Sequence, residues 1–342
     1  IDLVDMESLT FEHDTWQKDG GATKFNSSAV TGTDPEIRDM HQFMIGETSE
    51  LVCATQKDRL LVVGTAGVTK TILTETGAIF SHNNFVEGYN GTAKALYWFG
   101  GQASGGPKVY TGGTAAIPLG SLVGTVTANS GTETLTLTAH GLANDTRVFF
   151  VNTGGALPGG LNTLATPYWV VNTAANTFQV SISQGGAAVN ITSNGTGTTT
   201  VHRSTQATDW MDDAVVPRWG FMHRSRMIVG GATALHAVYT SVLNNHSDFL
   251  NSGTLYDEVY PGEGEIIVGG ISWRERAYLF KYPAGIYRLD DSSLDTADWG
   301  WKRVSRYVGA VSHASIVEAD DEVYFVSPDG FIHTLSSVQE YG

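Results

Sequence analysis

The segment DEVYFVSPDGFIHTL, residues 321–335, carries the pattern that decides the fold. Two runs of aromatic and β-branched residues flank a Ser-Pro-Asp-Gly sequence. This layout predicts a β-hairpin, because proline, aspartate and glycine favour a tight turn between two strands. The same layout occurs in four other segments, which span residues 58–73, 93–113, 225–241 and 275–291. The sequence therefore contains five copies of one hairpin.

The spacing of the hairpins indicates a repeat that is interrupted by an insertion. Equivalent positions are 36, 131, 50 and 47 residues apart, counted from Arg59, Ala95, Arg226, Arg276 and Val323. The long interval contains residues 122–203, which are rich in Thr and Gly and have a formal charge of zero. Alternating apolar runs there predict strands, and VNTAANTFQVS predicts a hairpin anchored by Phe178.

Repeats of this length, each with several short strands, are typical of a β-propeller, in which every blade is a small antiparallel sheet. A β-sandwich does not predict a repeated hairpin at this interval. We therefore expect an all-β propeller of five to six blades with an inserted small β-domain. Its first part spans residues 1–121, the insertion 122–203 and its second part 204–342. A hairpin near the N-terminus, with its turn at Asp19-Gly20-Gly21, is expected to close the ring with the last blade.

Composition agrees with a turn-rich all-β protein, since 41% of the residues are hydrophobic, 16% are charged and 40 are glycine. The net charge of -15 argues against a protein that reads nucleic-acid sequence, because such a protein needs a basic surface. An acidic surface suits either simple solubility or a conduit that lets DNA pass without adhesion.

The single cysteine, Cys53, excludes an intrachain disulfide and a metal cluster built on thiolates. It lies in an apolar run, so we expect a buried, unreactive thiol. No run of eighteen apolar residues is present, and the sequence predicts no membrane span. The first residues, IDLVDMESLT, do not have the pattern of a signal peptide.

Three pairs of carboxylates are candidates for a site, because glycosidases use two carboxylates across a cleft. All three pairs lie in polar, turn-like stretches, which also suits solvated loops or the acidic lining of a channel. The pairs are Asp212 with Asp213, Glu263 with Glu265, and Asp290 with Asp291.

Two tryptophans stand out among eight, most of which lie in apolar strands and are expected in the core. Trp299 and Trp301 alternate with Gly300, which places both on one side of an extended segment. If exposed, they are candidates for an interface or for contact with a glycan.

Other motifs do not support catalysis. His223, His236 and His246 lack the spacing of a metal site, and residues 64–71 lack the Gly-Lys-Ser/Thr of a phosphate-binding loop. Adjacent residues such as those of the His-Ser-Asp sequence at 246–248 cannot form a catalytic triad, whose members converge from separate segments. We therefore expect no enzyme, no cofactor and no metal.

The succession of segments outside the insertion resembles the β-propeller proteins of bacteriophage tails, most of all the tail nozzle (tail tubular) proteins of short-tailed phages. The resemblance covers residues 10–121 and 205–342. It is carried by GGPKVYTGGTAAIPLG, VPRWGFMHRSRMIVGGATALHAVYTSVLNNHSDF, YLFKYPAGIYRLDD, RYVGAVSHASIVEADDEVYFVSPDGFIHTL and VQEYG. Residues 134–181 separately resemble a small β-domain that is inserted into many phage tail and fibre proteins.

The resemblance implies a virion protein that forms a homo-oligomeric ring, commonly of six copies, below the portal and adaptor. In such a ring DNA passes along the axis without specific binding, and tail fibres attach outside. The alternative is a carbohydrate-binding or glycan-cleaving propeller of a virion or a secreted enzyme. That alternative predicts a monomer with paired carboxylates and exposed aromatic residues in one funnel.

Overall fold

The structure, a computed structural model, describes residues 9–12, 15–18, 37–55, 59–64, 67–74, 83–100, 107–113, 115–162, 168–204, 217–231, 235–249, 255–261, 264–293 and 295–341. Within these ranges the regular structure is almost entirely β, with one α-helix and two single-turn 3-10 helices. The predicted all-β class is confirmed.

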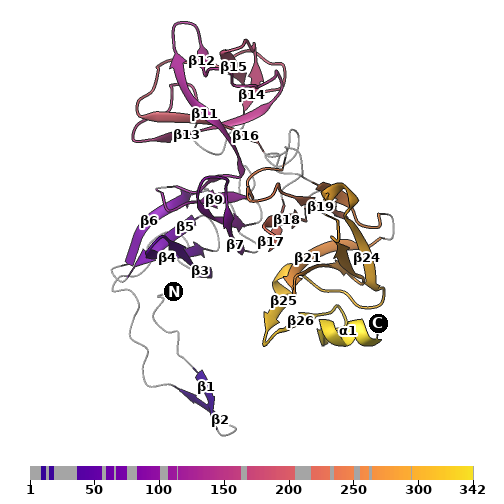
Figure 1. The fold of residues 1–342 in the computed structure, drawn as a ribbon. Coiled ribbons are helices and arrows are strands. Elements are labelled where there is room, and N and C mark those ends of the chain that lie inside the picture. The colour runs from indigo at the N-terminus through magenta and orange to yellow at the C-terminus, as the bar shows by residue number, and fades with distance from the viewer. Residues whose placement is uncertain are drawn as a thin grey trace.

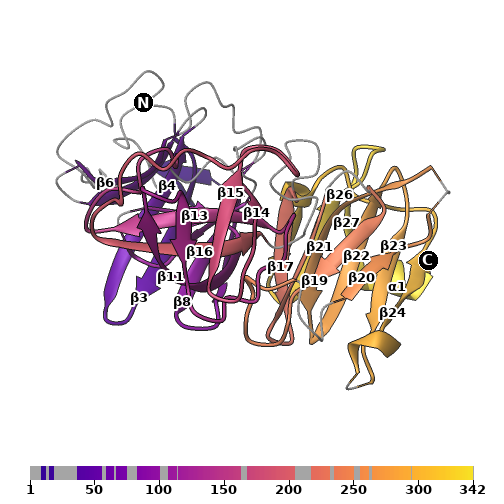
Figure 2. The same cartoon turned by 90° about the horizontal axis from the view of Figure 1, so that it is seen from above.

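Five antiparallel sheets follow one another along the chain, and each is a meander in which consecutive strands are hydrogen-bonded. The first four sheets have four strands each, and the fifth has three. Figure 1 shows the sheets along an arc, with the first and the fifth at its two ends. Figure 2 shows the same succession from above.

The sheets are numbered by their order in the chain. The first consists of β3 (Ile37–Ile45), β4 (Thr48–Thr55), β5 (Arg59–Gly64) and β6 (Gly67–Thr74). The second consists of β7 (Asn84–Tyr89), β8 (Lys94–Phe99), β9 (Lys108–Tyr110) and β10 (Ile117–Pro118). The third consists of β17 (Trp219–His223), β18 (Arg226–Gly230), β19 (Ala237–Thr240) and β20 (Leu255–Glu258).

The fourth sheet consists of β21 (Ile266–Trp273), β22 (Arg276–Tyr282), β23 (Ile286–Asp290) and β24 (Gly300–Ser305). The fifth consists of β25 (Ile316–Ala319), β26 (Glu322–Val326) and β27 (Ile332–Thr334), which leads into α1 (Leu335–Tyr341). The 3-10 helices η1 (Thr296–Asp298) and η2 (His313–Ser315) precede β24 and β25.

A closed six-stranded barrel separates the second sheet from the third. Its strands are β11 (Gly120–Asn129), β12 (Thr134–Thr136), β13 (Arg147–Thr153), β14 (Tyr168–Val171), β15 (Thr177–Ser181) and β16 (Thr198–Ser204). Gly120 pairs with Ser204, so the chain enters and leaves the barrel at one point. The stretch predicted as an insertion, residues 122–203, falls within this barrel, which stands apart from the arc in Figure 1.

All five predicted hairpins are present as antiparallel pairs, namely β5 with β6, β8 with β9, β18 with β19, β22 with β23, and β26 with β27. In the second to fifth sheets the hairpin consists of the second and third strands, whereas in the first sheet it consists of the third and fourth. The second strand of the first sheet begins at Thr48, eleven residues before Arg59. This difference in position explains why the first interval is short.

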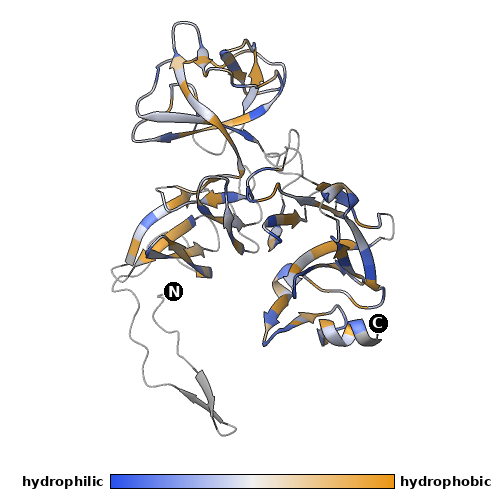
Figure 3. Cartoon of the chain, in the orientation of Figure 1, coloured by the Kyte–Doolittle hydropathy of each residue, from blue (hydrophilic) through white to orange (hydrophobic). Residues whose placement is uncertain are grey.

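Facing sheets pack through one apolar cluster at each junction, because alternate residues of every strand point to each neighbour. Figure 3 shows hydrophobic positions in the strands of the arc and in those of the barrel. Burying each large side chain stabilises the fold by about 1.5–3 kcal/mol. The four clusters include Val62 and Trp98, Phe99 and Val229, Ile228 and Leu279, and Phe280 and Phe325, in chain order of the junctions.

The barrel has a core of its own, which includes Phe150, Tyr168 and Val201. The hairpin predicted around Phe178 is confirmed, since β14 and β15 pair antiparallel and Phe178 is fully buried. The predicted burial of Cys53 is also confirmed, and burial raises the pKa of its thiol to about 12.

Near the N-terminus, β1 (Leu9–Glu12) pairs with β2 (Thr15–Lys18). In this pair Leu9 lies opposite Lys18 and Glu12 opposite Thr15. The turn predicted at Asp19-Gly20-Gly21 lies outside the described residues. The described sheets form an arc, and closure into a propeller ring stays a prediction.

Candidate functional site

Glu265, one of the six predicted acidic residues, is the counter-ion of a buried lysine. Its Oε2 lies 3.8 Å from Nζ of Lys281, whose side chain is fully buried. Lys281 also donates to the carbonyl of Tyr260 at 3.1 Å and lies over the ring of Tyr287. A buried charge needs such partners to offset its desolvation, so Glu265 has a structural role. Asp212, Asp213 and Glu263 lie outside the described residues.

Asp290 and Asp291 are adjacent in the chain but have different partners. Asp290 accepts from Lys302 at 2.5 Å on the surface, where its side chain is 36% exposed. Asp291 is 10% exposed, accepts from His223 at 2.8 Å and forms an ion pair with Arg224 at 3.0 Å. The two carboxylates therefore do not face one cleft, as the glycosidase hypothesis requires.

His223 connects two sheets through a Ser-His-Asp arrangement that sequence reasoning missed. Its Nε2 lies 2.8 Å from Asp291 and its Nδ1 lies 2.9 Å from Oγ of Ser272. Burial lowers the pKa of His223 more than the Asp291 carboxylate raises it. A neutral ring then donates from Nε2 to Asp291 and accepts the Ser272 hydroxyl proton at Nδ1. Because the His223 side chain is 1% exposed, we assign it to binding the third sheet to the fourth.

The sequence His246-Ser247-Asp248 forms no triad, as expected. The ring of His246 accepts from the backbone N–H of Tyr89 at 2.7 Å and donates to the carbonyl of Ser225. Ser247 is hydrogen-bonded to the hydroxyl of Tyr97 at 3.0 Å. These contacts join the second sheet to the third.

Trp299 and Trp301 belong to the junction between the third and fourth sheets. Trp301 is 8% exposed. Trp299 is half-buried, donates from Nε1 to the carbonyl of Ser293 and carries the guanidinium of Arg226 at 5.6 Å from its ring. They therefore do not form the exposed aromatic platform of a glycan site.

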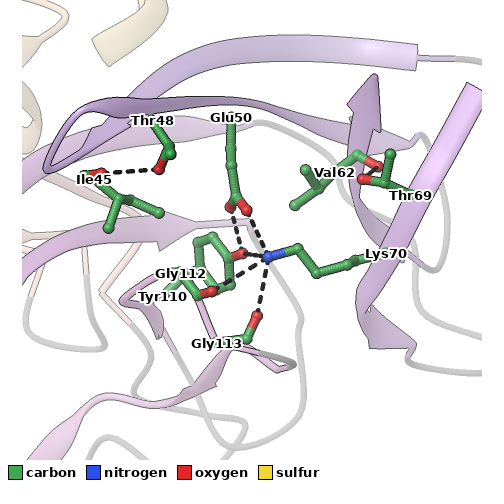
Figure 4. A network of polar contacts seen from close by, with 9 residues as sticks. All are labelled: Ile45, Thr48, Glu50, Val62, Thr69, Lys70, Tyr110, Gly112 and Gly113. Carbon is green, nitrogen blue, oxygen red and sulfur yellow. Dashed lines mark hydrogen bonds and ion pairs between the residues drawn. The ribbon is translucent and has the colours of Figure 1, made fainter. Parts of the chain in front are cut away.

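Figure 4 shows a polar network between the first and second sheets. Lys70 donates to Glu50 at 2.5 Å and to the hydroxyl of Tyr110 at 2.8 Å, and Tyr110 donates to the second oxygen of Glu50 at 2.5 Å. Burial and the Glu50 carboxylate raise the pKa of Tyr110 to about 12. Tyr110 therefore keeps its hydroxyl proton at neutral pH and can donate it to Glu50.

A cavity of about 390 Å³ lies where the second, third, fourth and fifth sheets meet, and it is the best candidate for a binding site. Asn84, Trp219 and Ile266, the first residues of β7, β17 and β21, line it together with residues 311–314. Most of its surface is apolar. The other described residues that line it are Asn83, Arg218, Gly231, Leu235, Ile267 and Val268.

His313 forms one wall of this cavity by stacking on Trp219, with ring centroids 5.7 Å apart and planes 16° apart. A Cβ at Gly269 would lie 2.7 Å from Nδ1 of His313, so glycine is needed there for His313 to approach. The sequence analysis did not predict this site. A signal was present, because Asn84, Trp219 and Ile266 each occupy the first position of the first strand in successive sheets.

A second cavity, of about 280 Å³, lies between β23, β24 and α1. It is lined by Arg288, Lys302, Arg303, Val304 and Gln339. Lys302 is paired with Asp290, and Nε of Arg303 donates to the hydroxyl of Tyr287 at 3.2 Å. Both cations thus already have partners within the fourth sheet.

Among the described residues, no cluster of three or more His, Cys, Asp or Glu side chains is placed to hold a metal ion. The described helices include none that is long and apolar enough to cross a membrane.

No protein-family model matches the chain, and no curated protein matches it. Among solved structures, apo AztD from Citrobacter koseri is 12% identical, with 91% of this chain and 71% of that chain covered and a TM-score of 0.34. A crystal structure of the computationally designed Ika8 protein is 10% identical, with 94% and 86% covered and a TM-score of 0.29. Similarities at this level carry no argument about fold or function.

Proposed function

We propose that the chain is a structural component of a phage tail, a nozzle-type subunit whose copies form a ring around the DNA exit channel. In this proposal the five sheets are blades of a β-propeller, and the protein catalyses no reaction. Portal or adaptor proteins and tail fibres are its partners, and the virion is its location. The proposal rests on the resemblance of residues 10–121 and 205–342 to tail nozzle proteins.

The observation that supports it best is the series of face-to-face sheets with an apolar cluster at each of the four junctions. Such an array is stiff, because closely packed interiors resist deformation. Polar links such as Tyr110 with Glu50 and His223 with Asp291 also cross the junctions. A ring that contains DNA under pressure requires stiff subunits, and this array of packed sheets is suited to that role.

The barrel supports the second part of the proposal, the docking of fibres or neighbours. It has its own core and is joined to the sheets at one point. Leu122 and Ile182 are 57% and 73% exposed on it. An independent module of this kind can project from a ring without disturbing the wall of the channel.

The net charge of -15 suits passage of DNA, since an acidic surface repels phosphate. The glycan alternative is less well supported, because Asp290 and Asp291 diverge and Trp301 is buried.

The native mass in solution, measured by light scattering, and imaging of the virion test the proposal. We expect a closed oligomer whose mass is a multiple of 36.6 kDa and density for it below the portal. A stable monomer that binds or cleaves a glycan on an array would refute it and favour the alternative.

A further inference from the structure

Residues 241–249 belong to the connection between β19 and β20 and reach from the third sheet to the end of β7 in the second. We call this loop the latch. We propose that the latch is released from the second sheet in mild acid, because its contact with that sheet requires a neutral ring at His246. The inference is independent of the tail function.

Backbone hydrogen bonds hold the latch on its own sheet. The N–H of Ser241 donates to the carbonyl of Met227 at 2.8 Å, and the N–H of Asn244 donates to the carbonyl of Ser225 at 2.9 Å. Neither bond involves the second sheet. The latch can therefore lose its contact with the second sheet and remain attached to the third.

His246 makes the central contact with the second sheet, through both backbone groups of Tyr89. The backbone N–H of His246 donates to the carbonyl of Tyr89 at 2.8 Å, and Nδ1 of the ring accepts from the N–H of Tyr89 at 2.7 Å. On the other side of the ring, Nε2 donates to the carbonyl of Ser225 at 2.9 Å. The next residue, Ser247, is hydrogen-bonded to the hydroxyl of Tyr97, whose side chain is fully buried.

Only the neutral ring of His246 fits these partners. The N–H of Tyr89 can only donate, and a protonated ring has an N–H at both nitrogens, so two donors would face each other 2.7 Å apart. A Cβ at Gly88 would lie 2.5 Å from Nδ1, so the charged ring has no room to turn away while the latch is in contact. Burial lowers the pKa of His246, in agreement with this geometry.

The titratable group that touches the ring is Tyr97, with ring centroids 6.4 Å apart, and burial raises its pKa, so it stays neutral in acid. Asp248 is the one carboxylate in the sequence of the latch, and it is buried. Because Asp248 moves with His246, release does not separate the two. Charged side chains of the surrounding strands and turns have contacts elsewhere: Glu87 with His41 and Lys94, Arg224 with Asp291, and Arg226 with Trp299.

The lowered pKa of His246 sets the pH range of the release. The neutral ring stabilises the contact fully above the unfolded pKa of about 6.5, and this contribution is lost as the pH falls through the lowered pKa. Between pH 7 and pH 5 one such group changes the ratio of released to bound latch by at most about 25-fold.

Hydrogen exchange of the intact protein, read by mass spectrometry at pH 7 and pH 5 and corrected for intrinsic exchange rates, tests the inference. In peptides that cover β7 and the latch, we expect protection to fall by about five- to 25-fold at pH 5. Peptides that cover β22, in the fourth sheet, should keep their protection.

Two variants separate His246 from other titrating groups. His246→Asn places Oδ1 where Nδ1 accepts from Tyr89 and does not titrate, so protection of the latch should be equal at the two pH values. His140→Asn in the barrel is the matched control, because Nδ1 of His140 likewise accepts a backbone N–H, from Leu142 at 3.0 Å. The control should keep the acid response of the latch.

A third variant releases the latch without acid. Gly88→Ala places a methyl group where the ring of His246 lies, so the latch should already be released at pH 7 and change little at pH 5. Circular dichroism establishes that each variant is folded. If His246→Asn does not fold, Gly88→Ala decides the question, and if neither folds, the comparison of the latch with β22 in the original protein decides it.

Three results overturn the proposal. The first is equal protection of the latch at pH 7 and pH 5 in the original protein. The second is an equal loss of protection in β22, which would show unfolding of the whole chain. The third is a folded His246→Asn or Gly88→Ala variant whose latch responds to acid as the control does.

Discussion

At the residue scale, buried histidines are the most informative side chains of this protein. Burial lowers the pKa of His202, His223 and His246, and that of His202 falls to about 4. Each ring is therefore neutral in the fold at pH 7. His202 is stacked on Phe149 in the barrel, with centroids 5.0 Å apart.

His202 should make the barrel less stable in mild acid. Its pKa is about 4 in the fold and about 6.5 in the unfolded chain, so between these values the unfolded state binds more protons. The contribution of neutral His202 to the free energy of unfolding is fully present above pH 6.5 and is lost as the pH falls toward 4. From pH 7 to pH 5 we expect a loss of roughly 2 kcal/mol from this group.

The measurement is thermal or chemical unfolding at pH 7 and pH 5. His202→Phe keeps the stacked ring and removes the titration, so its stability should fall less over this range than that of the original protein. An equal fall in both proteins would show that His202 is not responsible.

Asp291 should contribute far more to stability than its neighbour Asp290. Asp291→Ala leaves the buried Nε2 of His223 without its acceptor, and we expect a loss of about 1–3 kcal/mol in the free energy of unfolding. Asp290→Ala removes an exposed ion pair with Lys302 and should change stability little. Urea unfolding of both variants compares them, and similar losses would contradict the assignment.

At the scale of the elements, the main feature is that polar links supplement the apolar clusters between sheets. The hydroxyl of Tyr110 in the second sheet contacts Lys70 and Glu50 of the first, and His223 and Asp291 join the third sheet to the fourth. Arg274, in the turn after β21, pairs with Asp321 at 2.7 Å and so joins the fourth to the fifth. These links add directional contacts to the apolar packing between the sheets.

Tyr110→Phe should weaken the junction between the first and second sheets. It removes the hydroxyl that bridges Lys70 and Glu50, at a cost of about 1.5–3 kcal/mol for hydrogen bonds to charged groups. Tyr256→Phe is the matched control, because that hydroxyl also donates to a carboxylate, Glu258, but on the surface. We expect a change within about 0.5 kcal/mol for the control. Hydrogen exchange of β4 and β9 would show whether the loss is local to the junction.

At the scale of the whole molecule, the fifth sheet differs from the inner sheets of the arc because one of its faces has exposed apolar side chains. Val317 pairs with Tyr324, and Val326 pairs with Ile332, on the face of the fifth sheet opposite its core. Val317, Tyr324 and Ile332 are 53%, 38% and 71% exposed. Every other junction covers such a face with the next sheet, so in the proposed propeller we expect the part of the chain that closes the ring of blades to cover it.

Val317→Lys should therefore lower the free energy of unfolding, because it disturbs the contact that closes the propeller. A lysine on this face places a charge in the contact, which costs several kcal/mol if it is buried without a partner. Leu243→Lys is the control, since Leu243 is 54% exposed in a turn of the third sheet. Urea unfolding compares the two, and an equal free energy of unfolding in both variants would exclude this face as the closing contact.

Taken alone, the sequence determined the local structure. All five hairpins and the pair of strands around Phe178 formed as predicted, because strand propensity, alternation and turn residues act over a few neighbouring positions. The sequence also indicated that residues 122–203 form a separate module, because their composition differs from that of the rest of the chain. A module with its own core does not need the composition of the surrounding sheets.

Only the tertiary structure decided which side chains meet. Asp290 and Asp291 look equivalent in the sequence, yet one faces solvent and the other lies against His223. Asn84, Trp219 and His313 line one cavity although they are far apart in the chain. Such meetings depend on how one sheet packs against the next, and a shift of one residue in a strand turns every side chain to the opposite face.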